Sequence, residues 1–212
     1  MKTINEMKEL SGARKFASVL GKSTIDSTRE EYKFIEQTTE VLLAHGYGVI
    51  HGGYAGGAMS AASDTAHGYI LKHGLSPYLN IGIPQKQHDG LWDRVENASF
   101  TETTNDIYDR LRMVTSGDIA IICPLGGDGT ELEETIVFHE NVVKAGMNKY
   151  GGAHEKMTPL IFLQTQNGTD WKTLIQTKLA LLDTSTKSID EYEWLYFVDS
   201  IEAFEKVLMG IK

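Results

Sequence analysis

The sequence predicts an α/β protein with a single doubly wound parallel sheet and helices on both of its faces. Short apolar segments alternate with longer amphipathic segments along all 212 residues, which is typical of parallel strands joined by right-handed helical crossovers. Two glycine-rich turns, at 52–57 and 126–129, each join an expected strand to an expected helix. Because no repeat or linker divides the chain, we expect one Rossmann-like nucleotide-binding domain over 1–212, with 1–13 as an N-terminal arm or short helix.

The first half of the chain contains four short apolar runs and two segments with helical spacing. Strands are expected over 15–20, 47–51, 79–83 and 99–104. Helices are expected over 29–45 and 57–73. Gly46 stops the first helix. The second is rich in alanine and serine, and these small residues allow it to lie close to the sheet or to a ligand. Residues 85–99 show no clear periodicity.

The second half continues the same alternation. Strands are expected over 118–123, 159–163 and 195–198, and helices over 105–116, 130–145, 171–182 and 201–209. The first of these helices carries Ile107, Leu111 and Val114 on one apolar face. Residues 146–156 form a glycine-rich loop in this interpretation.

The stretch from 118 to 134 is the strongest functional signal. An apolar strand turns through Gly126, Gly127 and Gly129 into a helix that Thr130 opens. We expect these glycines to adopt positive φ and to let the backbone approach a ligand. The helix start offers unpaired N–H groups and a positive dipole end, which suit a phosphate. No Lys-Ser or Lys-Thr pair follows the glycines, so the turn is not a P-loop.

The acids in the next helical turn give the stretch a second feature. Glu131, Glu133 and Glu134 would repel a phosphate unless one of them has another role, so we interpret the stretch as a phosphate cradle with a carboxylate at its rim. Two structural alternatives stay open. Thr130 and Glu133 are spaced as a capping box, and a glycine-rich turn also occurs in many α/β proteins without a ligand.

Composition excludes several classes of function. The net charge of −9 argues against a general nucleic-acid or membrane-surface binder, which needs a basic footprint. No segment is apolar enough to span a membrane, and we expect a cytoplasmic protein. The single cysteine, Cys123, lies in an apolar strand and is expected to be a core residue. No grouping of His, Cys, Asp or Glu has metal-ligand spacing, so no metal or other cofactor is expected.

Some residues that could act chemically have structural interpretations. His51 is expected to be part of a strand end and His139 part of a helix surface. The tryptophans are expected to be packing residues: Trp92, Trp171 and Trp194.

Four motifs, at 21–23, 52–59, 107–111 and 126–133, together resemble those of the Lonely Guy family of cytokinin riboside 5′-monophosphate phosphoribohydrolases. Residues 126–133 are similar to the family's P-G-G-x-G-T-x-x-E motif, and residues 52–59 to its G-G-G-x-x-G-L-M cluster. Residues 21–23 stand where the family has Gly-Ser-Ser, and residues 107–111 where it has Met-His-Glu-Arg-Lys. Motif order and spacing agree from about residue 14 to 146. The departures from the family pattern are Tyr54, Tyr108, Leu111, Leu125 and Leu132.

The resemblance implies hydrolysis of the N-glycosidic bond of a nucleoside 5′-monophosphate to a free base and ribose 5-phosphate. Glu133 would be the catalytic carboxylate, acting on an oxocarbenium-like ribose, and Arg110 would position the nucleotide. The implied substrate- and phosphate-binding residues are Gly21, Ser23, Gly53, Gly57, Met59, Gly126, Gly127, Gly129 and Thr130. For Arg110 the structural alternative is a surface salt bridge with Asp106 or Asp109.

The resemblance also implies a homodimer with helix 105–116 near the interface. A second class of function stays open, because the superfamily includes proteins that bind a nucleotide or the molybdenum cofactor without hydrolysing it. A third, lysine decarboxylation, would need a lysine for pyridoxal phosphate, and Lys22 is the only lysine beside a motif.

Overall fold

One parallel sheet organises the protein, as a computed structural model describes it for residues 2–101, 103–150, 154–182 and 189–211. Its order is β4-β3-β2-β1-β5-β6-β7, and every neighbouring pair is parallel. The strands are β1 (Lys15–Leu20), β2 (Tyr47–His51), β3 (Asn80–Gly82), β4 (Ser99–Phe100), β5 (Ile119–Ile122), β6 (Leu160–Leu163) and β7 (Leu195–Val198). The predicted Rossmann-like α/β fold is therefore confirmed.

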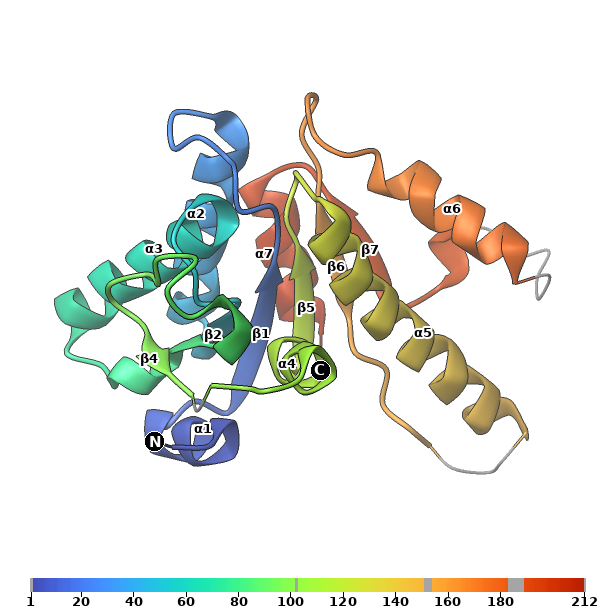
Figure 1. The fold of residues 1–212 in the computed structure, drawn as a ribbon. Helices are drawn as coiled ribbons and strands as arrows, with labels where there is room; N and C mark the ends of the chain where they lie inside the picture. Colours follow the sequence, from blue (N-terminus) through green and yellow to red (C-terminus); the bar gives the residue numbers. More distant parts are fainter. Residues whose placement is uncertain (1, 102, 151–153, 183–188, 212) are drawn as a thin grey trace.

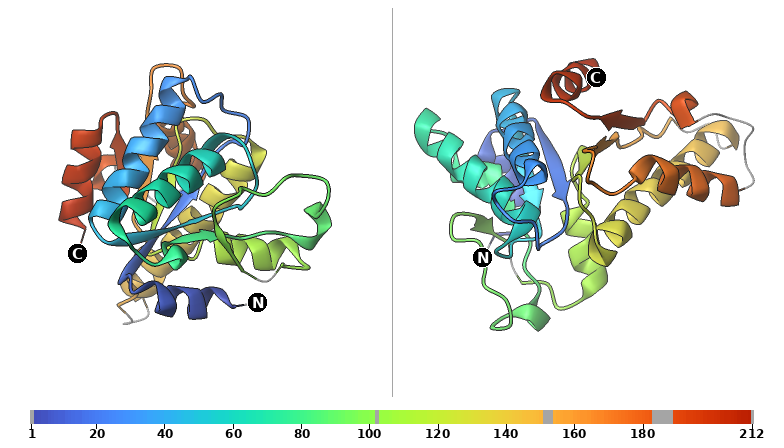
Figure 2. Two further views of the ribbon diagram at one scale, coloured as in Figure 1. Left: turned by 90° about the vertical axis from the view of Figure 1, so that its left-hand side faces the viewer. Right: turned by 90° about the horizontal axis from the view of Figure 1, so that it is seen from above.

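Helices cover both faces of the sheet (Figures 1 and 2). The helices are α1 (Ile4–Ser11), α2 (Glu30–Ala44), α3 (Gly57–His73), α4 (Ile107–Val114), α5 (Asp128–Tyr150), α6 (Trp171–Leu181) and α7 (Ile201–Gly210). On one face α2, α3 and α7 share a hydrophobic core, and on the other α1, α4, α5 and α6 share a second core. No helix in the described residues is both long and apolar enough to cross a membrane.

The expected N-terminal segment and the strand over 99–104 need adjustment. Within 1–13 the chain forms α1, which begins with a capping box between Thr3 and Glu6 and buries Met7. This segment is thus the short helix of the two options, packed on the body. Only Ser99 and Phe100 pair with β3, and Thr104 makes an isolated bridge with Gln85. Beyond Phe100 the contacts with β3 and its continuation are single hydrogen bonds, from the Thr101 N–H to the Gly82 carbonyl at 3.2 Å and from the Thr104 N–H to the Pro84 carbonyl at 3.2 Å.

Two helices differ from their expected bounds by two residues or more at each end. Helix α4 begins at Ile107 because the Asp106 side chain accepts a hydrogen bond from the Tyr108 N–H at 2.8 Å and caps it. Helix α5 begins at Asp128 and runs to Tyr150. The loop expected over 146–156 is therefore helical over 146–150, and 151–153 lie outside the described residues. Thr130 lies inside the first turn, so the capping box considered for Thr130 and Glu133 as a structural alternative does not form.

The side on which successive strands join the sheet changes between β1 and β5. It moves outward from β1 through β2 and β3 to β4, and then returns to place β5 beside β1. Loops at the carboxyl ends of the strands meet at such a switch point. There the Lys22 N–H donates to the Leu125 carbonyl at 3.0 Å, and the Lys22 carbonyl accepts from the Ala58 N–H at 3.0 Å.

This contact requires glycine at the start of α3. Gly57 has φ of +48°, and a Cβ built on it would lie 2.1 Å from the Lys22 carbonyl oxygen. A side chain at 57 would be strained and would push the loop after β1 away.

We expect Gly57→Ala to lower the free energy of unfolding by at least about 2 kcal/mol, because left-handed strain and a backbone clash add together. Gly68→Ala on the same helix is the control, because a Cβ there meets no atom within 4 Å. It should stabilise the protein by up to about 1 kcal/mol. Urea unfolding of both variants measures the difference, and equal stabilities would contradict the proposed contact.

Candidate functional site

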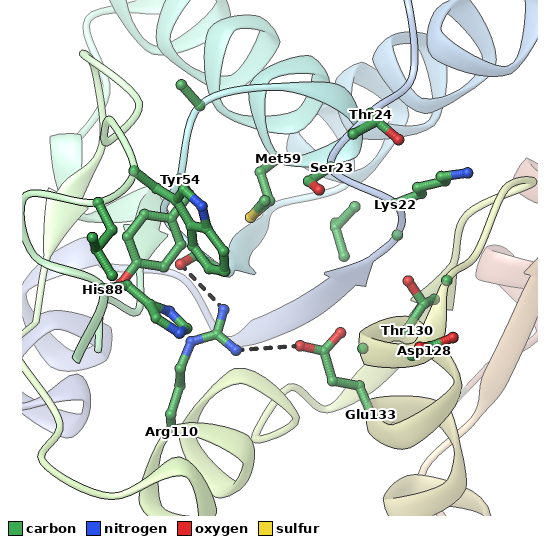
Figure 3. Close-up of a pocket in the computed structure, with 18 of the residues that line it drawn as sticks. Lys22, Ser23, Thr24, Tyr54, Met59, His88, Arg110, Asp128, Thr130 and Glu133 are labelled. Atoms are coloured by element: carbon green, nitrogen blue, oxygen red, sulfur yellow. Dashed lines mark hydrogen bonds and ion pairs between the residues drawn. The ribbon is translucent and has the colours of Figure 1, made fainter. Parts of the chain in front are cut away.

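A cavity of about 800 Å³ opens at the carboxyl edge of the sheet, beside the switch point (Figure 3). Its walls come from the loops after β1, β2 and β5, from the first turns of α3, α4 and α5, and from residues of the 88–93 segment. This volume is in the range that holds a drug-sized or cofactor-sized ligand. The two glycine clusters, which are more than sixty positions apart in the sequence, thus face one pocket.

Most of the predicted site residues line this cavity. They are Gly21, Ser23, Met59, Arg110, Gly127, Gly129, Thr130 and Glu133. Three predicted residues do not line it, and each has a structural role instead. A Cβ built on Gly53 would lie 3.2–3.4 Å from backbone atoms of Gly82 and Ile83. Gly57 approaches Lys22 as described above.

Gly126 is the third residue outside the cavity. A Cβ there would lie 2.5 Å from the Trp171 ring, and the Trp171 indole N–H donates to the Cys123 carbonyl at 3.0 Å. The Gly126 N–H itself donates to the Thr169 hydroxyl at 3.2 Å. Gly126 therefore makes room for the Trp171 ring of α6.

Of the two glycine clusters, the one at 52–57 contains the residues with positive φ. Gly53, Gly56 and Gly57 have φ of +81°, +105° and +48°, whereas none of Gly126, Gly127 and Gly129 is left-handed. The expectation of positive φ at 126–129 is therefore wrong. A Cβ at Gly127 or Gly129 would meet no atom within 4 Å. These two glycines thus leave open space at the start of α5, where first-turn N–H groups lack helical partners.

Arg110 and Glu133 face each other across the floor of the cavity (Figure 3). The Arg110 Nη1 lies 3.7 Å from the Glu133 Oε1, and the two side chains are 12% and 11% exposed. Arg110 also donates from Nε to the Ile83 carbonyl at 3.3 Å and from Nη2 to the Gly52 carbonyl at 3.4 Å. Carbonyls from two strand ends thus fix the guanidinium.

The surface salt bridge considered for Arg110 is wrong. Asp106 caps α4, and Asp109 lies 3.7 Å from Arg112 rather than from Arg110. The pairing of Arg110 with Glu133 instead joins α4 to α5 across the cavity.

Burial raises the pKa of the Glu133 carboxyl to about 7, against a smaller opposing effect of Arg110. Near neutral pH this carboxyl can therefore be either protonated or ionised. A group with such a pKa is suited to general acid–base chemistry and is a common mark of a functional site.

His51 is buried at the end of β2 and has a structural role, as predicted. The Gly53 N–H donates to His51 Nδ1 at 3.1 Å, so His51 Nε2 carries the proton toward the Asn80 Oδ1 at 2.9 Å. Burial lowers the pKa of His51 to about 4, and the ring stays neutral. His139 is exposed on α5. Cys123 is buried, and burial raises the pKa of its thiol.

Sequence reasoning missed an aromatic group in the cavity wall. Tyr54, His88 and Trp92 all line the cavity, and Trp92 is 57% exposed. The interpretation of Trp92 as a packing residue is therefore wrong, whereas Trp171 and Trp194 are buried as expected. Tyr54 could have been found as a departure from the family pattern. Trp92 gave no signal, because its segment has no periodicity.

Three polar residues of the cavity wall were not among the predicted site residues. They are Lys22, Thr24 and Asp128. The described part of the chain holds no group of three or more His, Cys, Asp or Glu side chains arranged to bind a metal ion.

Comparisons with known proteins relate the chain to solved structures only. No protein-family model matches the chain, and no curated protein matches it. A molybdenum cofactor binding protein from the phototrophic bacterium Rippkaea orientalis is 22% identical with a TM-score of 0.59, covering 95% of this chain and 99% of that one. The molybdenum cofactor carrier protein MCP from Chlamydomonas reinhardtii is 14% identical with a TM-score of 0.59, covering 92% and 96%.

A third solved structure shares the fold and has a different function. DNA processing protein A from Helicobacter pylori, which binds single-stranded DNA, is 15% identical with a TM-score of 0.54, covering 95% of this chain and 83% of that one. At these identities the likeness establishes the shared fold alone.

The raised pKa of Glu133 predicts a dependence of stability on pH. Between pH 4.5 and about 7 the folded protein binds more protons than the unfolded chain, so stability falls as the pH rises through this range. The loss attributable to Glu133 should reach up to about 3 kcal/mol, at about 1.4 kcal/mol per pKa unit. Glu133→Gln should remove this part of the slope.

Denaturant unfolding at pH 5, 6, 7 and 8 measures the slope. Burial also raises the pKa of Glu134, but both proteins share that contribution. Glu131→Gln, which removes an exposed acid from the same helix turn, serves as the charge control. Identical slopes for the wild type and Glu133→Gln would rule out the raised pKa.

Proposed function

We propose that the protein binds a small phosphorylated cofactor or nucleotide in this cavity and carries it without breaking it, with the molybdenum cofactor as the first candidate. The observation that carries this proposal is the likeness, over more than nine-tenths of the chain, to two proteins that are named for holding that cofactor. In this proposal residues 1–212 act as one binding domain. A homodimer with α4 at its interface remains a prediction.

The start of α5 supports the phosphate end of this proposal. Gly127 and Gly129 leave space beside the first-turn N–H groups, and the positive end of the helix dipole favours an anion there. Thr130 adds a hydroxyl from the same turn, and Lys22 and Ser23 face the cavity from the loop after β1. These groups would hold a phosphate without any metal ion.

Two departures from the Lonely Guy pattern favour a carrier over a hydrolase. Leu111, where the family has lysine, is buried in the core beneath α4. Leu132, where the family has the first of two acids, is 47% exposed and does not line the cavity. Neither side chain supplies a polar group to a reaction.

The pairing of Arg110 with Glu133 favours a second candidate, which is hydrolysis of a nucleoside 5′-monophosphate. In that reaction the bond between ribose C1′ and the base nitrogen breaks, and a water oxygen bonds to C1′. The base leaves with a proton, so atoms balance. Glu133, with a pKa of about 7, would accept the proton of the attacking water and stabilise the oxocarbenium-like ribose. Arg110 would orient the nucleotide through its planar guanidinium.

A substitution at Gly127 tests the phosphate end. We expect Gly127→Val to weaken binding of GMP by at least about tenfold, roughly 1.4 kcal/mol, because its side chain fills the space beside the helix start. The fold should survive, because that space is open. The matched control is Gly146→Val, at a position within α5 where a Cβ would also meet no atom within 4 Å. Calorimetry measures both, and unchanged affinity in Gly127→Val would remove the phosphate site.

Glu133→Gln separates the carrier from the hydrolase. The wild-type protein is incubated with nucleoside 5′-monophosphates and with the molybdenum cofactor, and binding and free base are both measured. A carrier binds ligand, releases no base, and keeps its affinity in Glu133→Gln. A hydrolase releases base, and Glu133→Gln lowers that rate by roughly 10²-fold or more. If neither ligand binds the wild type, the proposed function is wrong.

A further inference from the structure

We propose that Trp92, supported by Tyr54 and His88, stacks on a fused two-ring nitrogen heterocycle of the ligand. This inference rests on the proposed function, because it concerns the same cavity, and it narrows the ligand to a phosphate ester of a purine or a pterin type. Both are flat, fused aromatic rings that contain nitrogen, and an indole can stack on either.

Three aromatic rings form the wall of the cavity opposite the start of α5. The ring centroids of His88 and Trp92 are 4.1 Å apart, with 48° between their planes. Tyr54 makes edge-to-face contacts with both rings, at 5.6 Å each. We call these three residues the aromatic wall. Within it Trp92 is the member that remains exposed, at 57%.

Backbone and side-chain hydrogen bonds hold the aromatic wall in place. The Tyr54 hydroxyl donates to the Gln85 carbonyl at 3.0 Å and accepts from the Gln85 N–H at 2.7 Å. The Ala55 N–H donates to the Asp93 carbonyl at 2.8 Å. Trp92 is therefore fixed on both sides, at Gln85 and at Asp93, to the loop after β2.

The hydrogen bonds that hold the segment of Trp92 reduce the entropic cost of ligand binding. A surface tryptophan that is already ordered loses little conformational freedom when a ligand covers it. The Arg94 side chain adds a hydrogen bond to Asp89 at 2.6 Å and closes the segment that carries Trp92.

The charged pair lies between the aromatic wall and the phosphate end. The Arg110 guanidinium carbon is 5.9 Å from the centre of the Tyr54 ring, and its Nη1 is 3.7 Å from Glu133. Glu133 is one turn along α5 from Thr130. Figure 3 shows Tyr54 and His88 on one side of this pair and Thr130 and Asp128 on the other. A ligand with a ring at one end and a phosphate at the other fits this order.

His88 contributes as a neutral ring. Burial, followed by the nearby Arg110, lowers the pKa of His88, so no second positive charge accompanies Arg110 at the wall. A neutral wall favours an uncharged heterocycle over a second anionic group.

Tryptophan fluorescence reports directly on this contact. Of the three tryptophans, Trp171 and Trp194 are buried at 1% and 6% exposure. A ring that stacks on Trp92 should quench the emission of Trp92, whereas ribose 5-phosphate, which has no ring, should not. The probes are GMP, UMP, 6-hydroxymethylpterin phosphate and ribose 5-phosphate.

Replacing Trp92 separates stacking from phosphate binding. Trp92→Leu should weaken binding of GMP and of the pterin phosphate by roughly 5- to 150-fold, the range of base–aromatic stacking, and leave ribose 5-phosphate unchanged. Trp92→Phe should recover most of the affinity while removing the quenching. GMP should bind the wild type more tightly than UMP. The tighter of GMP and the pterin phosphate identifies the source of the ring.

The outcomes distinguish this inference from the proposed function. If the ring ligands bind Trp92→Leu as tightly as the wild type, the stacking proposal is wrong although the binding function stands. If no phosphorylated probe binds the wild type, the proposed function fails and stacking fails with it. Melting temperatures of the two Trp92 variants should match that of the wild type, because the side chain is largely exposed.

Discussion

The backbone of Lys22 makes the contacts on which the ligand edge of the sheet depends. Its N–H binds the loop after β5 and its carbonyl binds the first turn of α3, each at 3.0 Å. Three strand ends are thereby held in one arrangement by two backbone hydrogen bonds. Glycine at 57 is required because a Cβ would lie 2.1 Å from that carbonyl. Strand ends that are far apart in the sequence therefore meet through backbone, and side-chain chemistry is left free to vary.

The two charges in the cavity are arranged for a ligand more than for stability. Arg110 and Glu133 are both largely buried, yet their nearest nitrogen and oxygen atoms are 3.7 Å apart. Removing two charges from water costs about as much as such a pairing returns. Arg110 is instead supported by carbonyls from two strand ends. A buried acid whose pKa is near neutrality is a group that a ligand could protonate, deprotonate or hydrogen-bond.

The sequence predicted what local patterns determine. Strands β1, β2 and β7 have their expected bounds, because short apolar runs between turn residues define them. Eight of the predicted site residues line the cavity for a related reason: parallel strands deliver their following loops to one edge. Local patterns also misled at Thr130, where a cap-like spacing lies inside a helix that begins at Asp128.

What the sequence could not predict depends on tertiary contacts. Trp92 reaches the cavity because Tyr54 holds Gln85 and Ala55 holds Asp93, across more than thirty positions of chain. No periodicity records such contacts. The role of Gly126 was also beyond the pattern, because the space that a Cβ would take there is filled by the ring of Trp171, more than forty positions away in the sequence.

The contact between Gly126 and Trp171 has an implication for how such a site could be moved or evolve. The glycine motif accommodates an indole from the C-terminal third of the chain, and that indole is anchored on the carbonyl of Cys123 just before the motif. If residues 118–134 were grafted onto another parallel sheet, the turn would lack the Trp171 ring that packs against Gly126 and would lose its shape. The residue at 126 and the residue at 171 must therefore fit one another in volume, although no motif connects the two positions.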